Sequence, residues 1–101
     1  MKKFMRDGKV AVLYSPECGS GWYTWNTQYP ACVFDPDIVE IVLGEQGNIG
    51  ELAEEKWGEF FHSLGGWDLS VAWVEEGATF YIECNDVGCE QVLTVKQMMV
   101  A

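Results

Sequence analysis

Residues 9–14 (KVAVLY) form a nearly continuous apolar run bounded by Gly8 and Pro16, and this run constrains the fold more than any other feature. An apolar run this short, with turn-forming residues at both ends, is typical of a strand that is covered on both faces. We therefore expect a central strand here. We also expect a crevice at its carboxyl end, where ligand sites open in many α/β arrangements.

Two segments with helical spacing follow this strand. Asp35-Pro36-Asp37 is a strong helix start, because Asp35 can cap free backbone N–H groups and Pro36 suits the first helical position. Gly44 is a plausible end for this helix. A second helix is predicted from about residue 48 to residue 64, with apolar residues on one face, glutamates on the other and Gly65-Gly66 at its end.

The last third of the chain changes to the two-residue period of strands. Residues 69–74, 79–84 and 90–95 are three such segments, separated by turns at residues 75–77 and 85–88. We interpret them as an antiparallel meander. The sequence thus predicts a single α+β domain over residues 1–101, with the order β-α-α-β-β-β and two helices packed on one face of the sheet.

Sixteen acidic residues against six basic ones give the chain a formal net charge of −10. Such a chain repels nucleic acid and anionic membrane surfaces, so direct nucleic-acid or membrane binding is disfavoured. Two functional interpretations remain, a negative face aimed at a basic protein surface or a decoy that imitates a phosphate backbone. The simpler interpretation is a solvated surface that keeps the protein soluble.

No apolar stretch approaches the roughly 20 residues of a membrane span, and residues 1–8 lack the core of a signal peptide. We expect a cytoplasmic protein. The spacing of the cysteines does not predict a disulfide framework, and it leaves free thiols, a zinc site or a cross-strand Cys84–Cys89 bridge open. The four cysteines are Cys18, Cys32, Cys84 and Cys89.

The best candidate for a binding site is the stretch of residues 15–26, which combines glycines, hydroxyls and three aromatic rings after the first strand. Glycines let a ligand approach backbone N–H groups, which can bind an anion without a lysine, and indoles can stack on a planar ligand. The alternatives are a tight corner whose tryptophans fill the core, or a protein interface. The predicted ligand-binding residues are Gly19, Ser20, Gly21, Trp22, Thr24, Trp25, Asn26 and, from a later strand, Glu83.

Catalytic groups do not form a recognisable constellation. His62 is the only histidine and lies near the predicted end of the second helix, with neither a nucleophile pattern nor a second histidine at metal-ligand spacing. Glu83 and Glu90 flank the last turn and could face each other across the strand pair, which is unfavourable without a cation between them. We therefore expect a binding protein with no cofactor and no metal, not an enzyme.

Two segments of the chain resemble small phage-encoded proteins that carry a glycine-x-glycine-tryptophan-serine/threonine-threonine-tryptophan signature after their first strand. The segments are residues 12–15 (VLYS) with 19–26 (GSGWYTWN), and residues 73–83 (WVEEGATFYIE). The chain departs from this pattern at Tyr81, where arginine is common, and at Cys84 and Cys89, which flank a turn that is usually acidic and polar. A phosphate contact made by that arginine would be missing here.

The resemblance implies a phage protein of the anti-defence kind, which acts by binding in the cytoplasm of the infected bacterium. In one mechanism, the aromatic and glycine-rich stretch sequesters a nucleotide-derived immune signal, such as a cyclic nucleotide or an ADP-ribose derivative. In the alternative, the acidic helix faces inhibit a host nuclease or CRISPR effector by docking on its basic surface. A homo-oligomer suits the first mechanism and a monomer the second, and a plain structural role is a third interpretation.

Overall fold

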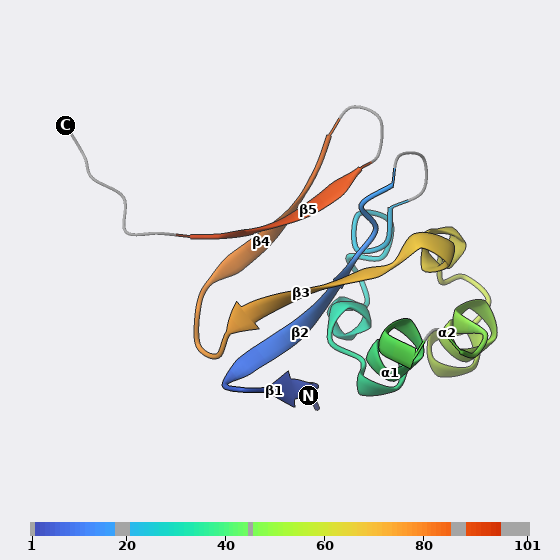
Figure 1. Ribbon diagram of the computed structural model, residues 1–101. Coiled ribbons are helices and arrows are strands. Elements are labelled where there is room, and N and C mark those ends of the chain that lie inside the picture. Colours follow the sequence, from blue (N-terminus) through green and yellow to red (C-terminus); the bar gives the residue numbers. More distant parts are fainter. Residues whose placement is uncertain (1, 18–20, 45, 86–88, 96–101) are drawn as a thin grey trace.

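β2 (Lys9–Tyr14) is the middle strand of an antiparallel sheet with the order β1-β2-β3, in which β1 is Met5–Arg6 and β3 is Ser70–Glu75 (Figure 1). Residues 10–13 of β2 are all buried, so the predicted central strand with both faces covered is confirmed. The computed structural model describes residues 2–17, 21–44, 46–85 and 89–95.

Helices α1 (Pro36–Gly44) and α2 (Ile49–Trp57) lie together on one side of this sheet (Figure 1). α1 begins where the sequence predicts, because the Asp35 carboxylate accepts hydrogen bonds from the backbone N–H groups of Asp37 and Ile38, at 2.9 and 3.2 Å. Asn48 caps α2 in the same way, by accepting from the Glu51 N–H at 2.9 Å.

The second helix is shorter than predicted, and this prediction is wrong at its C-terminal end. α2 stops at Trp57 because Gly58 adopts φ 93° and ψ 176°, a backbone conformation that is essentially restricted to glycine. The apolar pattern continues past this break, since Phe61 is buried in the core. Gly65 and Gly66 lie in a short 3-10 helix, η2 (Leu64–Asp68), and do not end α2. Another 3-10 helix, η1 (Pro30–Val33), precedes α1.

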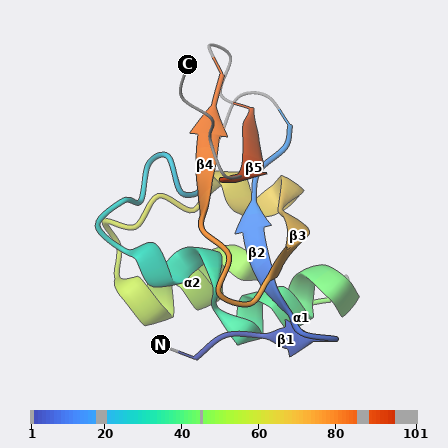
Figure 2. The ribbon, with the colours of Figure 1, turned by 90° about the vertical axis from the view of Figure 1, so that its left-hand side faces the viewer.

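The α+β class and the order of the main elements are confirmed, but the three C-terminal strands do not form one meander. Among the described strands, β4 (Phe80–Cys84) and β5 (Glu90–Thr94) pair only with each other, and this strand pair extends toward the end of the molecule away from β1 (Figure 2). The buried backbone N–H and C=O groups of β2 require hydrogen-bond partners, and β3 pairs with β2 along the whole length of β2. The chain then turns at Gly77, with φ 84°, and leaves this sheet.

The β4–β5 register also corrects the expected pairing of two glutamates. Glu83 lies opposite Gln91, and Glu90 lies opposite Cys84, so the two carboxylates do not face each other. Glu83 is exposed, whereas Glu90 is buried.

Candidate ligand-binding site

Glu90, the first residue of β5, points its carboxylate into the loop that follows β2. Its Oε1 atom accepts a hydrogen bond from the Ser15 N–H at 2.8 Å. Its Oε2 atom accepts from the Trp22 N–H and the Thr24 N–H, each at 2.9 Å, and from the Thr24 hydroxyl at 2.8 Å. The Glu90 N–H in turn donates to the Ser15 carbonyl at 2.9 Å. We call these donors of Ser15, Trp22 and Thr24 the carboxylate cradle.

The carboxylate cradle explains how a glutamate that is 3% exposed can keep a charge inside the protein. A buried carboxylate is tolerated when hydrogen-bond donors replace the water that it loses. The loop does bind an anion through backbone N–H groups, but the donors are those of Ser15, Trp22 and Thr24 and not the glycine N–H groups that the sequence suggested. The anion that fills this nest is a side chain of the same protein, so a ligand would have to displace Glu90 to use it.

Trp22 and Asn26 are also buried, and both make hydrogen bonds inside the protein. The Trp22 ring is 0% exposed, packs edge-on against Phe61 with 5.1 Å between ring centroids, and donates from Nε1 to the Cys32 carbonyl at 2.9 Å. The Asn26 amide donates to the carbonyls of Trp22 and His62, each at 2.7 Å, and accepts from the His62 N–H at 2.8 Å. In this conformation Trp22 cannot stack on a ligand, and Asn26 is 2% exposed with both amide atoms already hydrogen-bonded inside the protein.

Trp25 is the predicted aromatic contact that does reach the surface. It is 64% exposed and stacks on the His62 ring, with 5.7 Å between centroids and 26° between planes. Gly21 has φ 76°, and a Cβ there would lie 3.2 Å from the Trp25 ring, so glycine permits this packing. His62 is half-buried, and its Nδ1 atom is enclosed without a hydrogen-bond partner among the described residues. Gly19 and Ser20 lie outside the described residues.

A pocket of about 260 Å³ opens next to this stretch, between η1 and β4, and the sequence did not predict it. Aromatic rings dominate its walls, and Phe34 meets Phe80 edge-on with 5.9 Å between centroids. The ammonium group of Lys3 lies 4.5 Å from the centroid of the Phe34 ring. Of the described residues in the stretch 15–26, Tyr23 is the one that lines the pocket. Its lining residues are Tyr23, Pro30, Val33, Phe34, Phe80, Tyr81 and Ile82.

A larger hollow of about 660 Å³ lies between the end of α1, the start of α2 and η2. Glycine backbone and the side chains of Ile41, Ile49 and Trp67 form much of its wall, and none of its described lining residues is charged. Asn48 and Ser63 add uncharged polar groups to this mostly apolar wall, so the described lining offers hydrogen bonds but no charge to a ligand.

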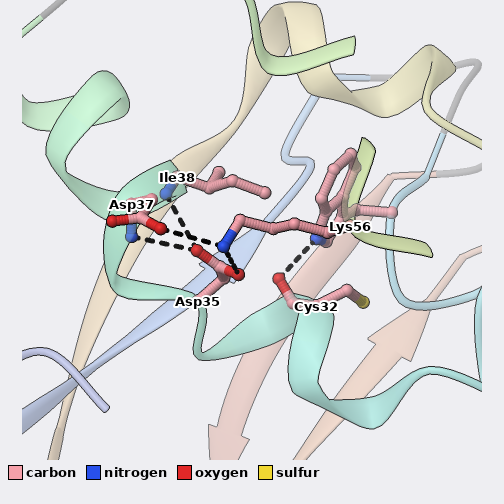
Figure 3. Close-up of polar contacts among 6 residues, drawn as sticks. Cys32, Asp35, Asp37, Ile38 and Lys56 are labelled. Carbon is pink, nitrogen blue, oxygen red and sulfur yellow. Dashed lines mark hydrogen bonds and ion pairs between the residues drawn. The ribbon is translucent and has the colours of Figure 1, made fainter. Parts of the chain in front are cut away.

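The described cations are distributed unevenly. Four of them lie within the first nine residues, at Lys2, Lys3, Arg6 and Lys9. The fifth, Lys56 on α2, is held by Asp35 at 3.1 Å and Asp37 at 2.9 Å (Figure 3). The hydrogen bond from Lys56 lowers the pKa of the Asp37 carboxyl, and the bonds to Asp37 and Asp35 raise the pKa of Lys56. Most of the described positive charge thus lies near the N-terminal strand, and of these cations Lys3 is the one that contacts a wall of the aromatic pocket, at Phe34.

The cysteines differ from one another in chemical state. Of the alternatives that the sequence left open, free thiols are found at Cys32 and Cys84, whereas Cys89 is disulfide-bonded, which rules out both a free thiol there and a Cys84–Cys89 bridge. Cys18 lies outside the described residues. Burial raises the pKa of the Cys32 thiol from 9.0 to about 12, and the nearby charge of Glu90 acts in the same direction. Among the described residues, no group of three or more His, Cys, Asp and Glu side chains could hold a metal ion.

Comparison with protein-family models, with curated proteins and with solved structures gives no match for this chain. In the part of the chain that the structure describes, no helix is both long and apolar enough to cross a membrane.

Proposed function

We propose that this protein is a non-enzymatic binding protein that sequesters a nucleotide-derived signal, and that the base enters the aromatic pocket between η1 and β4. The observation that carries this proposal is the combination of aromatic walls with the Lys3 ammonium group 4.5 Å from the Phe34 ring. Flat aromatic surfaces stack on bases of any sequence, and an adjacent cation favours the phosphate of the same ligand.

The size of the pocket supports a base as its occupant. Sites that enclose a whole small molecule have volumes of roughly 300–1,000 Å³. A pocket of about 260 Å³ is smaller than that, so it suits one ring system while the sugar and phosphates remain outside. Tyr81 is 50% exposed and lines the pocket, where it is available as one stacking surface.

Local positive charge removes the main electrostatic objection to an anionic ligand. A chain with a net charge of −10 repels phosphates overall. Lys2, Lys3, Arg6 and Lys9 offset this repulsion near the N-terminal strand, and of these Lys3 is the one in contact with a pocket wall, at Phe34. Charges separated by more than a Debye length, about 10 Å at 0.1 M salt, are largely screened from each other. The cation nearest to the pocket therefore contributes most to binding a phosphate.

The cellular setting follows from the resemblance to phage-encoded proteins and is part of the same proposal. We infer that the protein acts in the cytoplasm of an infected bacterium and captures the signal of a defence system. Disulfides are usually reduced in the bacterial cytoplasm, so we expect the disulfide at Cys89 to open there. None of the described lining residues of the pocket is a cysteine, so ligand capture is expected to be unchanged by a reducing agent.

Isothermal titration calorimetry with ADP-ribose and a cyclic dinucleotide tests the proposal. Tyr81→Ala should weaken binding of the responding ligand by about 5- to 150-fold, since loss of one base stack costs about 1–3 kcal/mol. Lys3→Gln should weaken binding and make it less sensitive to salt. Phe60→Ala is the control, because Phe60 is an exposed aromatic residue that does not line the pocket. Absence of binding to every nucleotide at millimolar concentration, or equal loss in the control, would overturn the proposal.

A further inference from the structure

The helical layer carries an excess of negative charge that has no counterpart among its described residues. Exposed carboxylates follow both helices and the residues just after α2, while Lys56 is already bound by Asp35 and Asp37. The exposed acidic residues are Asp37, Glu40, Glu51, Glu54, Glu55 and Glu59. Solubility alone would explain such a face if nothing else accompanied it.

Exposed aromatic side chains lie next to this acidic face, where α2 ends. The break at Gly58 turns Phe61 into the core and leaves Phe60 89% exposed. His62 follows two residues later, and its ring stacks on the exposed ring of Trp25. We call Trp25, Phe60 and His62 the aromatic cluster. Single exposed apolar residues are ordinary, but an exposed indole stacked on an imidazole, with the exposed Phe60 ring two residues away in the same segment, indicates an interaction surface.

We propose that the aromatic cluster and the acidic helices form a docking surface for an arginine-bearing basic surface of another protein. Charge complementarity selects the partner, because a carboxylate-rich rim attracts a basic protein and repels nucleic acid and anionic lipid. The exposed rings select arginine over lysine, because a planar guanidinium stacks on aromatic faces and also forms paired hydrogen bonds with carboxylates. This surface does not include the aromatic pocket, whose lining residues are all different.

The arrangement of charged and aromatic groups matches the way binding energy is distributed in protein interfaces. A few aromatic and arginine side chains at the centre carry most of the energy, and charged residues around them steer association. In this protein Trp25 and Phe60 supply the central rings, and Glu55 and Glu59 precede Phe60 on the same stretch of chain. Docking through this surface would be independent of nucleotide capture.

Fluorescence anisotropy with labelled hexa-arginine and hexa-lysine peptides tests the docking surface. We expect the arginine peptide to bind more tightly, and Phe60→Ala and Trp25→Ala each to reduce that binding by about 2- to 5-fold, as an exposed cation–π contact would. Tyr81→Ala is the matched aromatic control and should leave peptide binding unchanged. The pair Glu51→Gln and Glu55→Gln should weaken binding more than the pair Glu75→Gln and Glu76→Gln at the β3–β4 turn.

Three results would overturn this inference. Equal affinity for the two peptides, with no effect of Phe60→Ala or Trp25→Ala, would show charge attraction without a docking site. Equal effects of the two glutamate pairs would show that the acidic helices have no special part. Dimers that Phe60→Ala dissociates would show that a second copy of this chain covers the aromatic cluster. Because Tyr81→Ala tests the nucleotide pocket separately, failure of either proposal can be told from failure of the other.

Discussion

Replacing Glu90 tests the energetic role of the carboxylate cradle most directly. Glu90→Ala removes the acceptor of four hydrogen bonds, of which those from the Ser15 and Trp22 N–H groups are fully buried. Thr24 is only half-buried, so its N–H and hydroxyl can turn to water. The cost therefore comes mainly from two backbone donors that lose their partner inside the protein.

An orphaned buried donor costs about 1–3 kcal/mol, so Glu90→Ala should lower the free energy of unfolding by about 2–6 kcal/mol. That is a large share of the roughly 5–15 kcal/mol that stabilises a typical domain. Glu90→Gln keeps one acceptor oxygen but places an NH₂ group against at least one donor. We expect it to cost about 1–3 kcal/mol, less than the alanine variant.

Urea denaturation followed by circular dichroism measures this difference. With a slope of about 2 kcal/mol per molar, which lies within the range for small proteins, the alanine variant should unfold at a urea concentration roughly 2 M lower. Glu83→Ala is the control, because Glu83 is exposed on β4, and it should change stability by less than about 0.5 kcal/mol.

Formate provides a second measurement on the same variant. A small carboxylate can occupy the emptied carboxylate cradle and accept from the same N–H groups. Formate should therefore raise the midpoint of Glu90→Ala more than that of the wild type, with chloride at equal ionic strength as the reference. If Glu90→Ala and Glu83→Ala had equally small effects, the buried hydrogen bonds would not stabilise the fold and the reasoning would be refuted.

Three further predictions concern other parts of the molecule. Gly58→Ala should destabilise the protein by about 1–3 kcal/mol in urea denaturation, because φ 93° with ψ 176° strains any residue with a side chain. At pH 8, iodoacetamide should modify Cys84 and spare Cys32, whose pKa of about 12 keeps it as a thiol; peptide mapping by mass spectrometry reads this out. Lys56→Gln should reduce the loss of stability on acidification below about pH 4 at low salt. Asp37 has a folded pKa below its unfolded value of 3.8, so its contribution is present above pH 4 and is lost as pH falls through the folded pKa.

Each of these predictions has its own control. Gly44→Ala should be neutral or slightly stabilising, since Gly44 lies at the end of α1 without a positive φ. Apart from its chain neighbours and the backbone of its own helix, no described atom lies within 4 Å of the point that a Cβ would occupy. Cys32 should react in urea, where burial no longer protects it. The effect of Lys56→Gln should shrink in 0.5 M salt, because the partner Asp37 is exposed. The opposite result in a control would show that the physical cause given for that prediction is wrong.

Local sequence signals predicted the elements of this fold well where one residue type decides the backbone. Asp35 and Pro36 fixed the start of α1, and the apolar run before Pro16 identified the central strand. Gly58 was missed as a helix end because Phe61, three residues beyond it, still matches the helical apolar pattern. In the structure Phe61 reaches the core from a loop, so the pattern reports burial and not helix.

The site was predicted less well because it depends on pairs of residues far apart in the sequence. Residues 15–26 do contain an anion nest, but nothing local shows that residue 90 fills it. Spacing alone also does not show which of Trp22 and Trp25 enters the core. The pocket at Tyr23 and Phe34 forms only when β4 brings Phe80 beside η1, which no single segment reveals.

The Glu90 contacts have a consequence for the order in which the chain acquires its structure. They join residues that are 66 to 75 positions apart, so the donors of the loop after β2 lack this acceptor until β5 has been synthesised. During translation the loop after β2 therefore stays hydrated and incompletely packed until Glu90 has left the ribosome. A nascent chain halted before residue 90 should remain sensitive to protease at residues 15–17 and 21–26, whereas one released with β5 in place should become resistant there.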